Sequence, residues 1–303
     1  MPLLPINTDL MTLSRIDDAL KAAIAQLQEG GSDSPSVDAA VLLCHVLDKP
    51  RSYLLTWPEK TLSETQSRQF CSLITRRVTG EPVAYLVGER EFWSLPLKVS
   101  PSTLIPRPDT ERLVEIALEK SQQTQGDILD LGTGTGAIAL ALASELPERH
   151  VVGIDLRPEA QALALENAQR LTITNVTFLQ GSWFEPLKLG TKFALIVSNP
   201  PYIEENDPHL TQGDVRFEPL SALVAKDKGL ADIKHIAENA RHYLQQQGWL
   251  LFEHGYDQGA AVRALFESLG YHHVVTEKDY AGNDRVTLGQ YSHSEERASC
   301  TKD

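Results

Sequence analysis

The feature that most constrains the fold is a regular alternation of short apolar segments with amphipathic helices, which begins at Asp127. The predicted strands are 128–131, 151–155, 176–180, 193–198 and 249–253, and the predicted helices are 137–146, 158–171, 232–246 and 258–269. This order predicts an α/β fold with a parallel, doubly wound sheet. Two final segments, 273–276 and 285–289, surround a Gly-Asn-Asp turn and predict a hairpin at one edge of the sheet.

The first 80 residues have a different, purely helical pattern. After a loose extension over residues 1–12, helices are expected after Ser14, over 37–47 and after Ser63. Ser14 with Asp17, and Ser63 with Gln66, have the spacing of capping boxes. Helices this short must bury their apolar faces together, so we expect a small helical domain over 1–80. It is either a structural appendage or a docking site for a partner.

Residues 81–108 separate the two patterns and predict a hairpin or an extended linker, because aromatic and β-branched residues stand between Gly and Pro. Pro106 and Pro108 restrain the backbone on both sides of Arg107. The stretch 104–111 around Arg107 is either a stiff linker with an exposed arginine or a lid over a ligand. Asp109 is expected to cap the next helix and to open the main domain over 109–291, and the polar residues 292–303 are expected to form a frayed tail.

Composition narrows the function classes. The chain has 28 Lys and Arg against 41 Asp and Glu, a formal net charge of -13, and no long basic run, which argues against nucleic acid as the main substrate. The three cysteines, Cys44, Cys71 and Cys300, have neither metal-type nor disulfide-type spacing, so we expect no metal site. Without a signal-peptide pattern or a membrane-spanning stretch, the expected location is the cytoplasm.

The turn Gly132 to Gly136 connects the first predicted strand to a helix, where glycine permits tight turning and close approach of the backbone to a ligand. Asp155 ends the next strand, at the place where an acid meets a ribose diol in nucleotide-binding βαβ units. No Walker-type Lys-Ser/Thr follows, which argues against phosphoryl transfer. The glycine spacing also departs from the dinucleotide pattern, although a dehydrogenase remains possible.

A second chemical feature is Asn199-Pro200-Pro201-Tyr202, directly after the strand 193–198. The prolines stiffen the loop and remove backbone donors, so its carbonyls are free to accept hydrogen bonds. Asn199 adds a side-chain acceptor, and Tyr202 adds a flat ring. The set suits a planar NH2 group. His254, after Glu253 on the fifth strand, is more simply structural than a general base.

Two motifs carry a family resemblance. Asp130 to Gly136 resembles motif I of the class I S-adenosylmethionine-dependent methyltransferases, and Asn199 to Tyr202 resembles the fourth motif of those that methylate adenine, cytosine or glutamine nitrogen. The flanking segments 80–85, 92–97, 104–111 and 214–219 resemble the peptide-chain release factor glutamine methyltransferases, the PrmC/HemK family. This similarity extends from about Ile16 to Tyr291. It implies a Rossmann-like, mostly parallel seven-stranded sheet with an antiparallel edge hairpin, preceded by a small helical domain.

The resemblance also implies a reaction: methyl transfer from S-adenosyl-L-methionine to the N5 side-chain amide nitrogen of the glutamine in the Gly-Gly-Gln motif of class 1 release factors. By position, the implied cofactor residues are Gly132, Thr133, Gly134, Thr135, Gly136, Asp155, Trp183 and Asn199. Ser182 stands where the family often has an acid near the adenine. Asn199, Pro200 and Tyr202 are the implied catalytic residues, and Pro201 and Arg107 join them in substrate binding.

Some roles and alternatives stay open. Arg216, like Arg107, is a candidate for substrate docking or for pairing with an acid, and Phe217 and Pro219 either shape the amide pocket or only pack. A ribosomal-protein glutamine methyltransferase shares the residues Asn199 to Tyr202, called here the tetrad, but differs in the sequence around 106–109, where this chain follows the release factor version. A DNA adenine-N6 methyltransferase would need a basic groove, and a binding module without activity would not need the tetrad.

Overall fold

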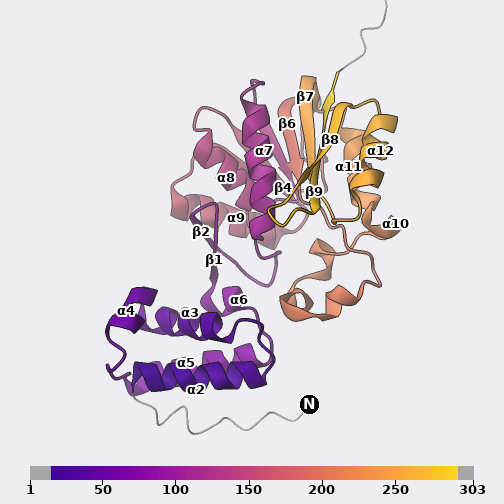
Figure 1. Cartoon of the computed structure of the whole chain (residues 1–303). Helices are drawn as coiled ribbons and strands as arrows, with labels where there is room; N and C mark the ends of the chain where they lie inside the picture. The colour runs from indigo at the N-terminus through magenta and orange to yellow at the C-terminus, as the bar shows by residue number, and fades with distance from the viewer. Residues whose placement is uncertain (1–14, 293–303) are drawn as a thin grey trace, which may run out of the picture. The chain divides into compact units, whose positions relative to one another are not determined.

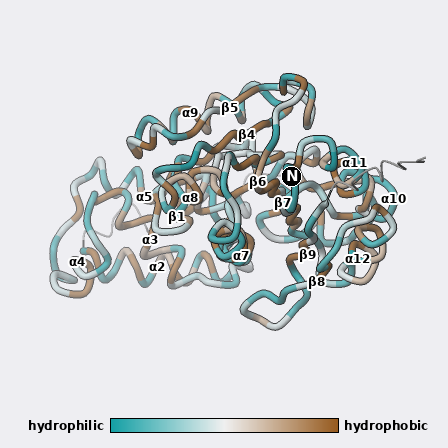
Figure 2. The backbone as a smooth tube through the Cα atoms, turned by 90° about the horizontal axis from the view of Figure 1, so that it is seen from above, coloured by the Kyte–Doolittle hydropathy of each residue, from teal (hydrophilic) through white to brown (hydrophobic). Residues whose placement is uncertain are grey.

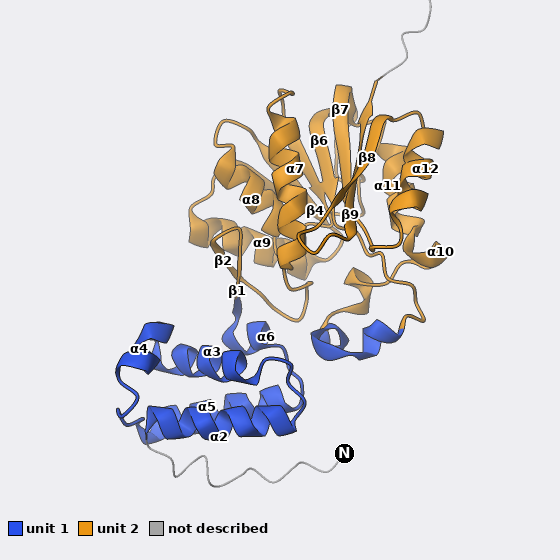
Figure 3. Ribbon diagram, viewed as in Figure 1, with its two compact units in different colours: residues 1–89, 208–217 blue, residues 90–207, 218–303 orange. Residues whose placement is uncertain are grey.

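The computed structural model describes residues 15–292 (Figure 1). The predicted extension, the Ser14 cap, residues 293–303 of the predicted tail and Cys300 therefore lie outside the described residues. The chain divides into two compact units, which Figure 3 colours separately. The first, called here the helical unit, contains the residues up to Glu89 together with Pro208–Phe217, and the sheet unit contains Arg90–Asp207 and the residues from Glu218 onward.

The helical unit packs its amphipathic helices around one apolar core. Its helices are α2 (Ile16–Glu29), α3 (Pro35–Leu47), α4 (Arg51–Thr56), α5 (Glu64–Val78) and α6 (Val83–Val87). Fully buried aliphatic and aromatic side chains from three of these helices meet in the core, among them Leu27, Leu43 and Phe70. The predicted capping box at Ser63 is confirmed: its Oγ accepts from the backbone of Gln66 at 3.2 Å, and the Gln66 side chain accepts from the backbone of Ser63 at 2.9 Å.

The segment Pro208–Phe217 belongs to the helical unit although about 120 residues separate it from α6. It forms two short 3₁₀ turns, η2 (Pro208–Thr211) and η3 (Gly213–Phe217). Arg77 donates to Asp38 at 2.8 Å and to Asp214 at 3.0 Å, and its side chain is only 12% exposed. Arg216 donates to the Thr79 carbonyl at 3.0 Å. These bonds fasten the segment to the end of α5.

The sheet unit contains the predicted seven-stranded sheet, which is confirmed with the order β5-β4-β3-β6-β7-β9-β8. Its strands are β3 (Ile128–Leu131), β4 (Val151–Asp155), β5 (Val176–Gln180), β6 (Phe193–Ser198), β7 (Leu244–Glu253), β8 (His272–Lys278) and β9 (Asp284–Tyr291). The first five pair in parallel, and β9 runs antiparallel to β7 and β8. A separate hairpin joins β1 (Glu89–Phe92) to β2 (Leu95–Lys98).

Helices cover both faces of this sheet, as apolar strands require. The core on one face includes side chains from α7 (Glu111–Ser121), α8 (Ala137–Glu145) and α9 (Pro158–Leu171). The core on the other face includes side chains from α11 (Ala231–Ala240) and α12 (Gly259–Ser268). Figure 2 shows the hydrophobic strands β6, β7 and β9 inside these layers. α8 is buried all round from Ala137 to Ala143, which fits its uninterrupted apolar sequence.

Three local predictions were wrong. The helix predicted over 232–246 ends at Ala240, and β7 already starts at Leu244, because pairing of Leu244 with the buried Phe193 of β6 overrides the local helical preference. Val83–Val87 form a helical turn instead of extended chain. Asp109 does not cap α7; it lies within the 3₁₀ turn Pro108–Thr110, which runs directly into the helix.

The sheet topology positions the site. β3 lies between β4 and β6, and Leu131 is in register with Ser198 of β6. The chain therefore switches direction across the sheet at β3, and open α/β sheets bind ligands in the crevice at such a point. The turn after β3 and the tetrad after β6 both leave the sheet at the carboxyl ends of these two neighbouring strands.

Candidate active site

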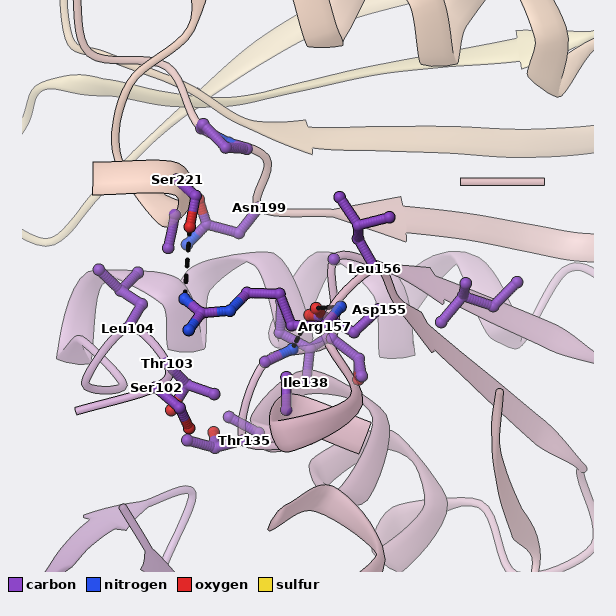
Figure 4. Close-up of a pocket in the computed structure, with 18 of the residues that line it drawn as sticks. Ser102, Thr103, Leu104, Thr135, Ile138, Asp155, Leu156, Arg157, Asn199 and Ser221 are labelled. Atoms are coloured by element: carbon purple, nitrogen blue, oxygen red, sulfur yellow. Dashed lines mark hydrogen bonds between the residues drawn. The ribbon is translucent and has the colours of Figure 1, made fainter. Parts of the chain in front are cut away.

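A cavity of about 280 Å³ lies at the carboxyl ends of β3, β4 and β6 (Figure 4). All of its lining residues belong to the sheet unit. Most of them come from the turn after β3, the end of β4 and the residues that follow it, the loop after β5, the tetrad, and the segments 102–110 and 221–222. The predicted cofactor residues, except Gly136, thus line one cavity together with Arg107.

The turn after β3 needs glycine at three positions. Gly132, Gly134 and Gly136 have φ of 73°, 55° and 82°, a region that L-residues rarely adopt. A Cβ on Gly136 would stand 3.0 to 3.1 Å from side chains of the surrounding core, so α8 packs closely under the turn. The backbone N–H groups of Gly132 and Thr133 donate to the Ile154 carbonyl at 2.9 and 3.0 Å. The turn is therefore held against the end of β4.

Asp155, at the end of β4, is oriented by two backbone donors. One carboxylate oxygen accepts from Gly134 at 2.9 Å and the other from Arg157 at 3.0 Å. An ionised carboxylate can accept about four hydrogen bonds, so Asp155 retains capacity for a ligand. It lines the cavity and is half-buried. Asp155 thus presents a fixed carboxylate acceptor to the cavity.

Asp130 lies beneath the turn and is fully buried. Burial raises the pKa of its carboxyl to about 7, and the negative charge of Asp155 adds to the rise, against a 2.6 Å hydrogen bond from Thr133 that lowers it. The carboxyl therefore titrates near neutral pH. The sequence marked Asp130 only as the start of a motif.

Trp183 contributes a flat surface to the cavity wall. Its backbone has φ of 46°, and one edge of its ring lies 3.7 Å from the position that a Cβ on Gly132 would occupy. Ser182 lines the cavity beside it, and its backbone N–H donates to Glu185 at 3.2 Å. An aromatic ring and a hydroxyl thus stand across from the glycine turn.

The tetrad divides between the cavity wall and the layer behind it. Asn199 and Pro201 line the cavity, whereas Pro200 and Tyr202 are absent from its lining. The Asn199 side-chain nitrogen donates to the Thr110 hydroxyl at 3.3 Å. Below it, the Ser198 hydroxyl donates to the Leu131 carbonyl at 2.6 Å, which ties the start of the tetrad to β3.

Tyr202 is held by Glu253, a residue that sequence reasoning passed over. Its hydroxyl donates to Glu253 Oε1 at 3.3 Å, and the Glu253 side chain is buried at the end of β7. Burial raises the pKa of Glu253, while hydrogen bonds from Thr110 and Tyr202 and the charge of Arg285 oppose the rise. Burial likewise raises the pKa of Tyr202, with the charge of Glu253 adding to it, so Tyr202 keeps its proton. Glu253 could have been found from the sequence, because an acid at the carboxyl end of a predicted strand is expected near the ligand site.

His254 is placed as a structural residue. Its Nδ1 lies 2.8 Å from the Gly255 carbonyl, and its Nε2 lies 2.8 Å from the Thr287 hydroxyl. Burial lowers the pKa of its fully buried ring, which favours the neutral form. With both nitrogens engaged, His254 has no free position from which to accept a substrate proton.

Arg107 and Glu218 join two walls of the cavity. The Arg107 guanidinium donates to Glu218 Oε1, and the Ile105 backbone donates to the other carboxylate oxygen at 3.1 Å. Across the cavity, Arg157 donates to the Ser221 hydroxyl at 3.3 Å, as the dashed line in Figure 4 shows. Sequence reasoning missed both partners, because the spacing between bonded residues exceeds 60 positions.

The chain is similar to known proteins over nearly its whole length. The PrmC N-terminal domain family matches residues 18–88, and a methyltransferase domain family matches residues 122–291. A release factor glutamine methyltransferase of Vibrio cholerae is 70% identical over 93% of this chain and 98% of its own. The release factor glutamine methyltransferase of Escherichia coli (strain K12) is 57% identical, over 90% of this chain and 97% of the relative's own length. The chain belongs to the release factor glutamine methyltransferase family.

The fold has more distant relatives outside this family. The catalytic domain of hMettl16, solved in complex with the MAT2A 3'UTR hairpin 1, superposes with a TM-score of 0.55 at 11% identity, over 84% of this chain and 92% of that one. At this identity the likeness shows a shared fold alone. Within residues 15–292, no helix has the length and apolarity to cross a bilayer, and no group of three or more His, Cys, Asp or Glu could hold a metal ion.

Proposed function

We propose that this chain transfers a methyl group from S-adenosyl-L-methionine to the N5 side-chain amide nitrogen of the glutamine in the Gly-Gly-Gln motif of class 1 release factors. The observation that carries the proposal is the placement of Asn199 in the wall of the cavity that the glycine turn and Asp155 also line. Relatives that share 51 to 70% of their residues with this chain are named release factor glutamine methyltransferases.

The cavity residues fit the cofactor. The glycine turn would leave room for the methionine part, the half-buried Asp155 carboxylate would accept from the ribose hydroxyls, and the Trp183 ring would pack beside the adenine. Ser182 would stand where the family often has an acid for the adenine amino group. When bound, S-adenosyl-L-methionine supplies an electrophilic methyl group on a positively charged sulfur.

The tetrad prepares the substrate nitrogen. An amide nitrogen is a weak nucleophile, because its lone pair is delocalised into the carbonyl. The Asn199 side-chain oxygen accepts one amide N–H and the Pro200 carbonyl accepts the other, which draws electron density onto the nitrogen and fixes its direction of attack. The Asn199 nitrogen is engaged by Thr110, so the side-chain oxygen is the atom available to the substrate. Tyr202 lies against the amide plane.

Two other substrate classes have less support. A DNA adenine methyltransferase would need a basic surface, which a net charge of -13 disfavours. A ribosomal-protein glutamine methyltransferase would use the same tetrad chemistry, but the relatives named above are release factor enzymes. We therefore propose a release factor as the protein partner, with no nucleic acid or membrane partner and a cytoplasmic location.

The test is methyl transfer from labelled S-adenosyl-L-methionine to purified unmethylated release factor, with DNA and a ribosomal protein as competitors. The label should appear on the Gly-Gly-Gln glutamine. Asn199→Ala should abolish transfer while cofactor binding survives, because the glycine turn and Asp155 remain. Asn239→Ala is the matched control, because the Asn239 side chain donates to the His235 carbonyl within α11, and Asn239 does not line the cavity. Label on DNA, or full activity of Asn199→Ala, would contradict the proposal.

A further inference from the structure

A left-handed backbone turn precedes α11. Asp227, Lys228 and Gly229 have φ of 56°, 54° and 79°, so three consecutive residues adopt a conformation that is unfavourable for two of them. The side chains of Asp227 and Lys228 are exposed, and therefore do not require it. Such strain persists only where surrounding structure imposes it, and it gathers at functional sites.

The turn is pressed against the tetrad. Gly229 is buried, and a Cβ there would lie 2.0 Å from the carbonyl oxygen of Tyr202. No side chain can occupy that space without moving the Tyr202 backbone. The left-handed conformation is thus the way in which the chain brings a bare backbone up to Tyr202.

Gln258, just before α12, fixes this contact. Its side-chain nitrogen donates to the Tyr202 carbonyl at 3.0 Å and to the Lys228 carbonyl at 3.1 Å. Its side-chain oxygen accepts from the Gly255 backbone at 2.8 Å. The amide therefore uses both donors and its oxygen to join the tetrad, the left-handed turn and the loop after β7.

Tyr202 is consequently restrained at three places. Its hydroxyl is bound to Glu253 and its carbonyl to Gln258. The next residue, Ile203, forms two backbone hydrogen bonds, to Leu223 at 2.9 Å and from Ala225 at 3.0 Å. A ring that must lie against an amide plane needs such a fixed backbone, because a displacement of about 1 Å at a reacting centre can cost a hundredfold in rate.

We propose that Gln258, together with the turn 227–229, is a positioning device for Tyr202 in the methyl transfer reaction. This inference rests on the proposed function. Gln258 acts through Tyr202 and touches no reacting atom. Neither Tyr202, nor the turn, nor Gln258 lines the cavity. A substitution in Gln258 or in the turn 227–229 should therefore lower kcat without weakening cofactor binding.

The first test is Gln258→Glu, which keeps the shape and the oxygen but places a carboxylate against two carbonyls. We expect kcat to fall about 10- to 100-fold, with the cofactor Kd from calorimetry within about twofold of wild type. Gln245→Glu is the matched control: Gln245 also donates to a carbonyl, that of Gln125 at 2.7 Å, but it lies at the amino end of β7, away from the tetrad. Its kcat should not change.

The second test is Gly229→Ala, which should likewise lower kcat and leave the cofactor Kd close to that of wild type. Gly270→Ala is its control, because Gly270 has φ of 83° but nothing within 4 Å of an added Cβ. An unchanged kcat in both Gln258→Glu and Gly229→Ala overturns the inference, as does a joint loss of kcat, cofactor binding and folding, which indicates a merely structural role. If wild type does not methylate release factor, the proposed function fails; if it does and the variants match it, only this inference fails.

Discussion

The pairing of Arg107 with Glu218 offers a sharp test of how the cavity wall is held. Glu218 has no exposed side-chain surface, whereas Arg107 is 33% exposed. Arg107→Met leaves the buried carboxylate without its guanidinium partner. Glu218→Gln removes the charge but keeps an oxygen for the Ile105 N–H. The double variant removes both charges.

The expected magnitude lies between two limits. Breaking a fully buried ion pair costs about 3 to 5 kcal/mol, and an exposed pair contributes about 0 to 1 kcal/mol. Because water reaches a third of Arg107, we expect Arg107→Met to lower the free energy of unfolding by about 2 kcal/mol. The coupling energy between the two substitutions should be about 1 kcal/mol.

Urea unfolding of the wild type and the three variants measures this cycle. Methyl transfer to release factor by the same four proteins separates a wall-fastening role of Arg107 from the predicted substrate contact. If Arg107 only fastens the wall, the double variant should have the same kcat/KM as Arg107→Met and Glu218→Gln, within about threefold. A coupling energy below about 0.3 kcal/mol would refute the reasoning about stability. A large loss of kcat/KM in Arg107→Met that Glu218→Gln does not share would show that Arg107 contacts the substrate.

Three further predictions concern other parts of the chain. Asp155→Asn removes a charged acceptor, so the cofactor Kd should rise about 10- to 100-fold with little change in stability, as calorimetry and thermal unfolding can show. In the folded state the pKa of Asp130 is raised to about 7, so the contribution of this carboxyl to stability is full below about pH 4 and is lost as pH rises through 7. The free energy of unfolding of the wild type should therefore exceed that of Asp130→Asn by more at low pH than at neutral pH. A difference that grows toward pH 8 would contradict this. Arg77→Met should release the segment Pro208–Phe217, so limited proteolysis should cut there faster than in wild type, whereas Arg68→Met, on the exposed side of α5, should not change the rate.

The sheet could be predicted from the sequence because its signal is local. The segments 128–131, 151–155, 176–180 and 193–198 became strands with the predicted bounds, since each is an apolar run between turn residues. The glycine turn, Asp155 and Asn199 were also predictable, because strand ends at a switch point must meet. The structure brings these residues to one cavity.

What the sequence did not predict depends on contacts between distant residues. The bond from Arg77 to Asp214 spans 137 positions and that from Arg107 to Glu218 spans 111, and no local pattern marks either pair. The strand start at Leu244 has the same origin, since it depends on pairing with Phe193 of β6, about 50 positions away, and the pairing is irregular up to Trp249. The left-handed turn at 227–229 has only a partial local signal, because Gly and Asp adopt positive φ more readily than other residues but Lys does not.

The central claim is that the tetrad presents acceptors to a glutamine amide beside the methyl donor. Its most direct test is mass spectrometry of release factor after reaction with labelled S-adenosyl-L-methionine. The account predicts one methyl group on the side-chain nitrogen of the Gly-Gly-Gln glutamine with wild-type protein, and none with Asn199→Ala, although this variant still binds the cofactor. A methyl group at any other residue, or on that glutamine with Asn199→Ala at the wild-type rate, would contradict it.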